Sequence, residues 1–169
     1  MKLYLTRCVS SCATLFLVHD TLGTRCCSVR PLSGLFSDGF QITGVLNRQQ
    51  TDIYVSQTMF PNGRRFHIQE GGVRRAQVLL SLNGAAASIR LDRRPCGLLG
   101  SPLLGEYTLT DAAGEPIFSQ ILHKRQGTAT SYLLNIPDDA LAPECLGIAL
   151  CLSRSLTVRR GIFIPVSTD

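Results

Sequence analysis

The segment Ala140–Arg154, ALAPECLGIALCLSR, differs from the rest of the chain and decides the fold. From Leu146 to Leu152 it is apolar on every side of a helix, which is typical of a helix buried in protein or in a membrane. About thirteen helical residues span only ~20 Å, less than the ~30 Å hydrocarbon core of a bilayer. Asp138 and Asp139 precede the segment and can cap its start. We therefore predict a helix over about residues 139–155 that is buried inside the protein.

Upstream of this helix, short extended segments alternate with turn residues, which is the pattern of an all-β protein. A three-residue pattern recurs before turns and consists of an aromatic residue, any residue and an aliphatic residue. It occurs in Phe16–Asp20, Phe40–Gly44, Phe66–Gly71 and Tyr107–Asp111. Each copy is followed by a second alternating segment, at Cys26–Arg30, Asp52–Ser56, Val73–Leu82 and Pro116–Leu122, so each pair predicts a hairpin. Further strands are expected at Lys2–Val9, Ala86–Asp92 and Thr130–Ile136, with Thr157–Val166 as a candidate for the last. The total is about twelve.

So many strands in one small domain must bury an inner face and cover their edges, and a closed barrel does both. The length of 169 residues, with 44% hydrophobic and 17% charged, suits one globular domain. We predict a mainly β fold over residues 1–169, a closed antiparallel barrel that encloses the one hydrophobic helix. Residues 157–169 are expected to form a tail or a strand, and the Pro/Gly-rich segment Arg94–Gly105 a loop. No run of about 20 apolar residues occurs, which excludes an integral membrane helix.

Nearly all the positive charge is arginine, since Lys2 and Lys124 are the only lysines among 17 Lys+Arg, against 12 Asp+Glu. A guanidinium binds phosphate or carboxylate through two parallel hydrogen bonds. Neighbouring side chains in a strand point to opposite faces, whereas a turn can present both on one surface. Two arginine pairs are expected in turns, so the candidate anion-binding residues are Arg64, Arg65, Arg93 and Arg94. The alternative is that they are ordinary solvated turn residues. Trp is absent and the pairs lack interleaved aromatic residues, which disfavours nucleic-acid binding.

The seven cysteines contain no C-x-x-C motif and, with three histidines, lack the spacing of a structural zinc site. We expect reduced thiols that act as small core residues in a cytoplasmic protein, with no metal and no cofactor. The alternative is secretion, because Lys2 and Arg7 precede an apolar stretch as in a signal peptide. Ser10, Ser11 and Thr14 dilute that stretch, which disfavours this alternative.

The chain contains no Gly-x-Ser-x-Gly, P-loop or His-Glu-x-x-His motif. His19 and Asp20 are adjacent in a predicted strand, so their side chains should point to opposite faces. His67 alternates with Phe66 and Ile68, which is the pattern of a structural strand residue. We therefore expect that the protein is not an enzyme.

Several short motifs, taken in order, resemble one known family. Met1–Leu5 and Phe16–Gly23 are similar to the first strand and first hairpin of LURP-one-related proteins, which belong to the tubby-like superfamily alongside phospholipid scramblases. The strongest match is Tyr107–Ile117, continuing through Tyr132–Ile136 into Leu141–Leu152. The resemblance extends from Met1 to about Leu156, and it rests on the order and spacing of the motifs. It implies a twelve-stranded antiparallel barrel threaded by a hydrophobic C-terminal helix.

The resemblance also implies a function by analogy with tubby domains. We expect a non-enzymatic module that binds anionic phospholipid or phosphoinositide head groups, peripheral at a membrane surface. The alternative is a structural or protein-interaction domain with no small-molecule ligand. Scramblase-like lipid transport is not expected, because the fold needs the apolar helix and that helix is too short to span a bilayer.

Overall fold

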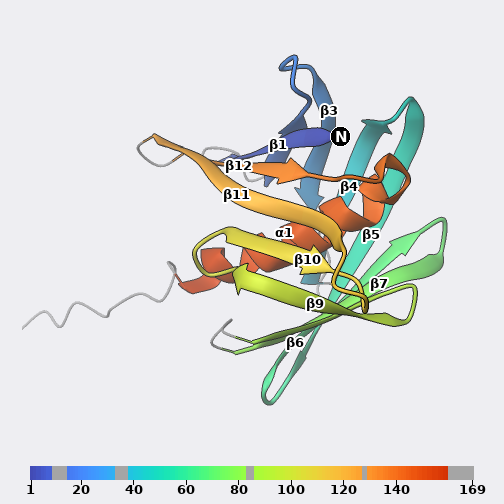
Figure 1. Cartoon of the computed structure of the whole chain (residues 1–169), viewed down its shortest axis with the longest axis vertical. Helices are drawn as coiled ribbons and strands as arrows, with labels where there is room; N and C mark the ends of the chain where they lie inside the picture. The colour runs from blue at the N-terminus through green and yellow to red at the C-terminus, as the bar shows by residue number, and fades with distance from the viewer. Residues whose placement is uncertain (9–14, 33–37, 83–85, 127–128, 160–169) are drawn as a thin grey trace, which may run out of the picture.

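Twelve antiparallel strands close into a barrel around one helix in the computed structural model, which describes residues 1–8, 15–32, 38–82, 86–126 and 129–159 (Figure 1). Each strand pairs with the next along the chain, and β1 returns to β12 with Leu3 opposite Leu134. The predicted fold class is confirmed. The strands are β1 (Lys2–Arg7), β2 (Phe16–His19), β3 (Arg25–Pro31), β4 (Asp38–Leu46), β5 (Gln49–Phe60), β6 (Gly63–Glu70), β7 (Val73–Ser81), β8 (Ala87–Leu91), β9 (Arg94–Ser101), β10 (Glu106–Thr110), β11 (Pro116–Gln126) and β12 (Ala129–Asn135).

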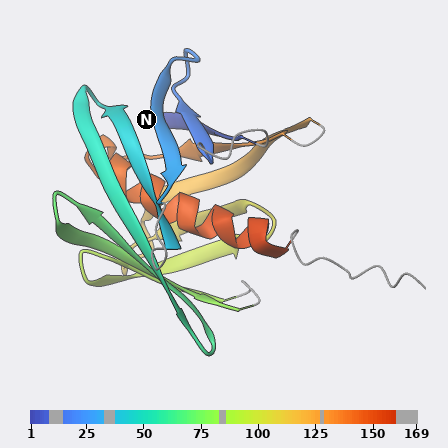
Figure 2. The same cartoon turned by 180° about the vertical axis from the view of Figure 1, so that it is seen from behind.

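The helix α1 (Ala142–Arg159) runs through the barrel, as Figure 2 shows from behind. A short 3₁₀ turn, η1 (Asp139–Leu141), precedes it, and the Asp138 carboxylate accepts a hydrogen bond from the Ala140 N–H at its start. Leu146, Ile148 and Leu152 are fully buried. They pack against the inward-facing side chains of the strands. The helix therefore covers the inner face of the sheet, as a second sheet does in a β-sandwich. The prediction of a buried helix at this position is confirmed.

The barrel wall approaches the helix closely at Gly147. A Cβ atom at this position would lie 3.0 Å from Cγ2 of Ile68 on β6. The absence of a side chain at Gly147 therefore brings β6 and α1 together on this side of the barrel. The approach matters for the site described below, because it fixes β6 and its neighbour β7 against the first turns of the helix.

One of the twelve strands is a different segment from the one expected from sequence. Strand β9 lies in the segment 94–105 that was predicted to be a loop, and it pairs with β8 and β10. Proline and glycine lower its intrinsic strand propensity, but ladder partners on both sides override that preference. Packing also favours glycine at position 97, since a Cβ there would lie 2.5 Å from Oγ1 of Thr110.

The end of the helix was also predicted wrongly. Residues 157–159 were assigned to a tail or strand, yet they form the last turn of α1. Thr157 and Val158 favour strands slightly when considered alone. Extending an existing helix adds one hydrogen bond for each residue that is fixed, and this gain outweighs that preference. The remainder of the predicted tail, residues 160–169, lies outside the described residues.

No disulfide joins any two of the six cysteines that the structure describes. Cys27, Cys145 and Cys151 are buried in the core, whereas Cys8, Cys26 and Cys96 are half-buried. Burial raises the pKa of the Cys27 thiol to about 12, so it stays protonated and packs as a small apolar side chain. Cys12 lies outside the described residues.

Candidate functional site

The first predicted arginine pair lies on a strand rather than in a turn. The β5–β6 turn consists of Pro61 and Asn62, and β6 begins at Gly63, so Arg64 and Arg65 point to opposite faces. Arg65 is exposed, with its guanidinium 5.8 Å from the Phe60 ring centroid. Arg64 is half-buried, and its Nε has no hydrogen-bond partner among the described residues. The short turn explains the error, because the strands start pairing immediately after two residues.

The second predicted pair is divided between a turn and a strand. Asp92 and Arg93 form the two-residue β8–β9 turn with φ of 45° and 68°, the left-handed backbone of a type I′ hairpin. Arg94 is the first residue of β9. The Asp92 N–H donates to the Arg75 carbonyl over 2.8 Å, which ties this turn to β7. Arg93 and Arg94 consequently line two different clefts.

The two predicted pairs lie at opposite ends of β7. Arg64 and Arg65 pair with Leu80 and Leu79, whereas Arg93 lies beside Arg75. Five residues of extended strand separate these positions by roughly 17 Å. One ligand group therefore cannot contact both pairs at once.

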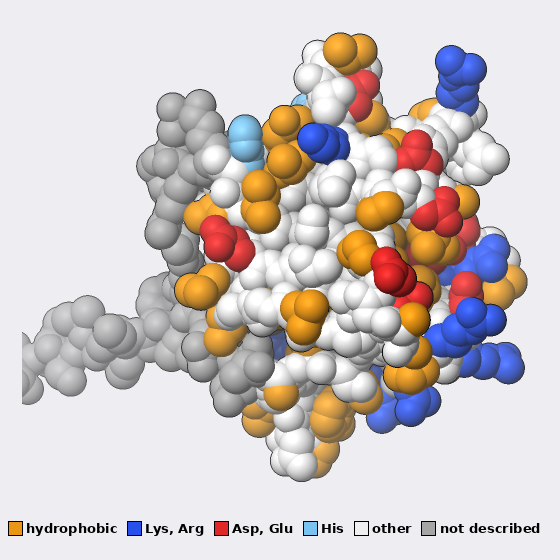
Figure 3. Space-filling model, in the orientation of Figure 1, with side chains coloured by type: hydrophobic (Ala, Val, Ile, Leu, Met, Phe, Trp, Pro, Cys, Tyr) orange, Lys and Arg blue, Asp and Glu red, His pale blue; other side chains and the backbone are white. Residues whose placement is uncertain are grey.

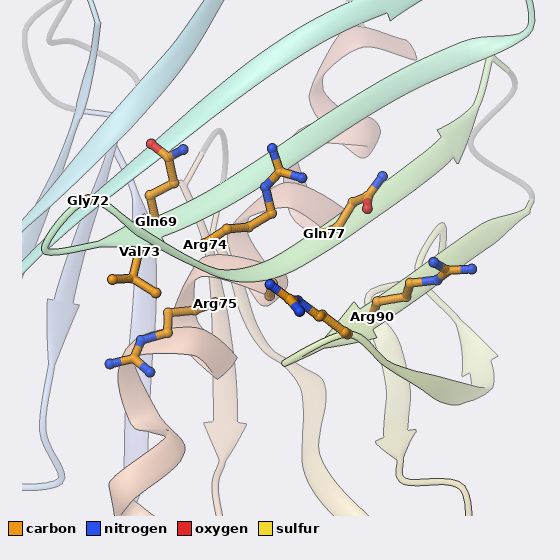
Figure 4. A pocket seen from close by; sticks show the side chains of 9 residues that line it. Gln69, Gly72, Val73, Arg74, Arg75, Gln77 and Arg90 are labelled. Carbon is orange, nitrogen blue, oxygen red and sulfur yellow. The ribbon is translucent and has the colours of Figure 1, made fainter.

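The structure instead gathers four arginines around one open cleft of about 490 Å³. This arginine cleft is lined by Gln69, Gly72, Val73, Arg74, Arg75, Ala76, Gln77, Arg90 and Arg93. It lies on the outside of the barrel over β6, β7, β8 and the β8–β9 turn (Figure 4). In Figure 3, Lys and Arg side chains gather at the lower right of the face shown, near β7 in Figure 1, with some acidic side chains among them.

Strand register places the polar side chains of this cleft. Gln77 on β7 lies opposite Arg90 on β8, and Gln69 on β6 lies opposite Arg74 on β7. Residues directly opposite on neighbouring strands share a face of the sheet. The alternating buried residues of the same strands, such as Val78 and Ile89, point into the core. The outward positions of three strands thus supply guanidinium and carboxamide groups to one surface.

A β-bulge separates Arg74 from Arg75. The β6–β7 register shifts between Ile68 and Gln69, which leaves Arg75 as the extra residue. Its Nε lies 3.7 Å from Oε2 of Glu70 and 3.8 Å from Oε1 of Glu144 in the first turn of α1. Figure 4 shows Arg74 and Arg75 on opposite sides of the β7 ribbon. The bulge therefore directs one arginine toward the helix and the other toward solvent.

The remaining arginines of the cleft have no such partner. In the part of the chain that the structure describes, no carboxylate forms an ion pair with Arg74, Arg90 or Arg93. The cluster affects its surroundings, since burial and the charges of Arg74 and Arg65 lower the pKa of nearby His67. By contrast, burial raises the pKa of Glu144 beside Arg75, and the Glu70 carboxylate adds to this effect. The cleft is therefore a surface of uncompensated positive charge with hydrogen-bond donors.

A second cleft of about 560 Å³ lies on the other side of the β8–β9 turn. Most of its lining is apolar, from Leu91, Pro95, Cys96, Ala112, Ala113, Ile117 and Leu141. Asp92, Arg94 and Asp111 also line it. We call it the apolar cleft.

The described ranges of the chain lack two other kinds of feature. None of the helices there has the length and apolar character required to cross a membrane. Those ranges also hold no group of three or more His, Cys, Asp or Glu residues placed to bind a metal ion.

No protein-family model and no curated protein sequence matches this chain. A solved structure does match it. The X-ray structure of the Arabidopsis thaliana protein AT5G01750 superposes with a TM-score of 0.56 over 90% of this chain and 92% of that one. The two sequences are 14% identical, so the comparison establishes a shared fold. The agreement spans nearly the whole of both chains.

Sequence analysis found only part of this site. Of the four arginines around the cleft, only Arg93 was among the predicted residues, and Arg74 and Arg75 were not. Arg90 is isolated in sequence and gave no signal. The missing information was the register, because only the pairing of β7 with β8 places Arg90 beside Gln77.

Proposed function

We propose that this chain is a LURP-one-related, non-enzymatic binding domain whose arginine cleft binds the phosphate of an anionic phospholipid or phosphoinositide head group at a membrane surface. The observation that supports this most is the set of three arginines around one open cleft, none with a described carboxylate partner. The order of the sequence motifs and the fold shared with the plant protein support the family assignment.

The chemistry of the cleft favours binding over catalysis. A guanidinium offers two parallel N–H donors that match two phosphate oxygens, and the Gln69 and Gln77 amides add further donors. Guanidinium and carboxamide groups do not exchange protons near neutral pH, so they are suited to holding an anion. The cleft volume of about 490 Å³ lies within the range of small-molecule sites.

Salt-sensitive binding alone would not support the proposal, because any exposed positive charge is screened over ~8 Å at physiological ionic strength. Substitution of arginine by lysine is more informative, since lysine keeps the charge but cannot form the paired hydrogen bonds. We expect Arg90→Lys and Arg93→Lys each to weaken binding to vesicles containing phosphoinositide by about fivefold to tenfold, equivalent to ~1–1.4 kcal/mol. Co-sedimentation with vesicles at physiological salt measures this effect.

Arg25→Lys is the matched control, since Arg25 is an exposed strand arginine on β3, away from the cleft. Its affinity should equal that of the wild type. Equal binding by all three variants would mean that only a diffuse positive field attracts the vesicles, and the proposed site would be rejected.

The second candidate function is a protein-interaction domain with no small ligand. Apolar side chains on the β9–β10 hairpin favour it, since Leu99 is 63% and Leu104 is 72% exposed. This candidate replaces the first if neither the wild type nor any variant binds anionic vesicles.

A further inference from the structure

The arginine cleft and the apolar cleft lie at the same end of the barrel. The β6–β7, β8–β9 and β10–β11 turns all lie at this end, because each strand reverses direction relative to the one before it. The 3₁₀ turn η1 lies there as well, since the Asn47 side chain in the β4–β5 turn donates to the Asp139 carbonyl over 2.7 Å. Leu141 of η1 contributes to the apolar cleft. The two clefts are therefore parts of one rim.

The β8–β9 turn separates the clefts by the width of a single hairpin. Arg93 lines the arginine cleft, whereas Asp92 and Arg94 on either side of it line the apolar cleft. Neighbouring strands lie only about 5 Å apart. A group held by Arg93 could thus be joined to one in the apolar cleft through a few bonds across this turn.

The apolar cleft cannot be a second phosphate site. Asp92 and Asp111 contribute two carboxylates against the single guanidinium of Arg94, so a second anion would meet net negative charge. The Asp111 carboxylate is held in this position, because its Oδ1 accepts hydrogen bonds from the Ala113 and Glu115 N–H groups at 2.8 and 2.9 Å. The lining of the apolar cleft therefore favours an uncharged group.

The floor of the apolar cleft suits a hydrocarbon. Leu91 belongs to the buried core, and the partly buried Ile117, Leu141 and Cys96 pack against it. Burial raises the pKa of the Cys96 thiol, so this group remains neutral. The small side chains of Ala112 and Ala113 leave the cleft open toward solvent. A chain placed there would remove apolar surface of both partners from water.

We propose that the two clefts form one composite site for a phosphate monoester with a single unbranched alkyl chain, with the phosphate in the arginine cleft and the chain crossing the β8–β9 turn into the apolar cleft. This inference rests on the proposed function, since it takes the arginine cleft as the phosphate site. It adds that the protein contacts the first part of the ligand's alkyl chain as well as its charged group.

A series of alkyl phosphates from methyl to octyl, each below its aggregation concentration, tests the proposal by calorimetric titration of the full chain. Affinity should rise about threefold to fourfold for each buried methylene and then level off when the cleft is full. Propyl phosphate should bind more tightly than glycerol phosphate, which has a similar length but a polar chain.

Two substitutions at Ala112 test where the chain lies. Ala112→Trp fills the apolar cleft and Ala112→Asp adds a charge to it, while both leave the arginines in place. Both variants should bind methyl phosphate like the wild type and lose the increase with chain length. Leu104→Asp is the control, because Leu104 is exposed in the β9–β10 turn at the other end of the barrel. Arg93→Gln should weaken binding of every member of the series by the same factor.

The outcomes separate this inference from the function on which it rests. Arginine-dependent binding with no dependence on chain length would overturn the composite site and leave the phosphate site intact. Chain-length dependence that survives both Ala112 substitutions would also overturn it, since the chain would then lie elsewhere. Absence of binding by any alkyl phosphate would reject both proposals.

Discussion

Ile148→Asp is expected to abolish folding, because it places an unpaired carboxylate inside the barrel. Ile148 is fully buried at the centre of α1, with apolar helix neighbours on both sides. An isolated buried charge costs several kcal/mol, which is comparable to the whole stability of a typical domain, about 5–15 kcal/mol. The variant should be insoluble, or should lack a cooperative thermal transition by circular dichroism.

Two control variants distinguish burial of charge from other effects of substitution. Leu22→Asp introduces the same charge at a turn position that is 88% exposed, and its melting temperature should match the wild type. Ile148→Val removes one methyl group and should cost about 1 kcal/mol. A soluble Ile148→Asp protein with the wild-type melting temperature would contradict a helix inside the barrel.

Gln120→Ala should be the second most damaging change, with an expected loss of about 3 kcal/mol in the free energy of unfolding. Gln120 is fully buried, and its Oε1 accepts a hydrogen bond from the Tyr107 hydroxyl over 3.1 Å. Its Nε2 donates to Oγ of Ser153 over 3.4 Å. The side chain thus links β10, β11 and α1. Truncation would leave both a cavity and a buried Tyr107 hydroxyl without this acceptor. Urea denaturation measures the change.

Gln41→Ala is the matched control, since the Gln41 amide donates to Asp52 at the barrel surface. It should cost less than about 0.5 kcal/mol. A double-mutant cycle with Tyr107→Phe should show a coupling energy between residues 107 and 120 of at least ~0.5 kcal/mol. Equal stability of the two glutamine variants would contradict a polar link between the helix and the wall.

The core of this fold was predictable because each element shows a clear local period. The alternation of Phe66, His67 and Ile68 gives a strand with one buried face, and the apolar run of residues 146–152 gives a buried helix. The expected number of strands agrees with the structure, although one of the expected strands was assigned to the wrong segment. Strand β9 replaced the candidate at 157–166, since ladder pairing outweighed the weak propensity of a Pro/Gly-rich segment.

The candidate site was less predictable because it depends on register. The sequence predicts ligand-binding arginines at adjacent turn positions, and of the four predicted residues only Arg93 lines the arginine cleft. Arg90 and Gln77 are thirteen residues apart in sequence and directly opposite in the sheet. The bulge between Ile68 and Gln69 separates Arg74 from Arg75. The composition of this segment does not predict it.

The most direct test of the central claim is a titration of the ¹⁵N-labelled protein with inorganic phosphate, observed through the arginine Nε–Hε signals. The signals of Arg74, Arg90 and Arg93 should shift together along one saturating curve, because they line the same cleft. Those of Arg25, Arg30 and Arg48, which are exposed and do not line this cleft, should stay in place. Small shifts of similar size at all six arginines, or none at any of them, would contradict a phosphate site in the arginine cleft.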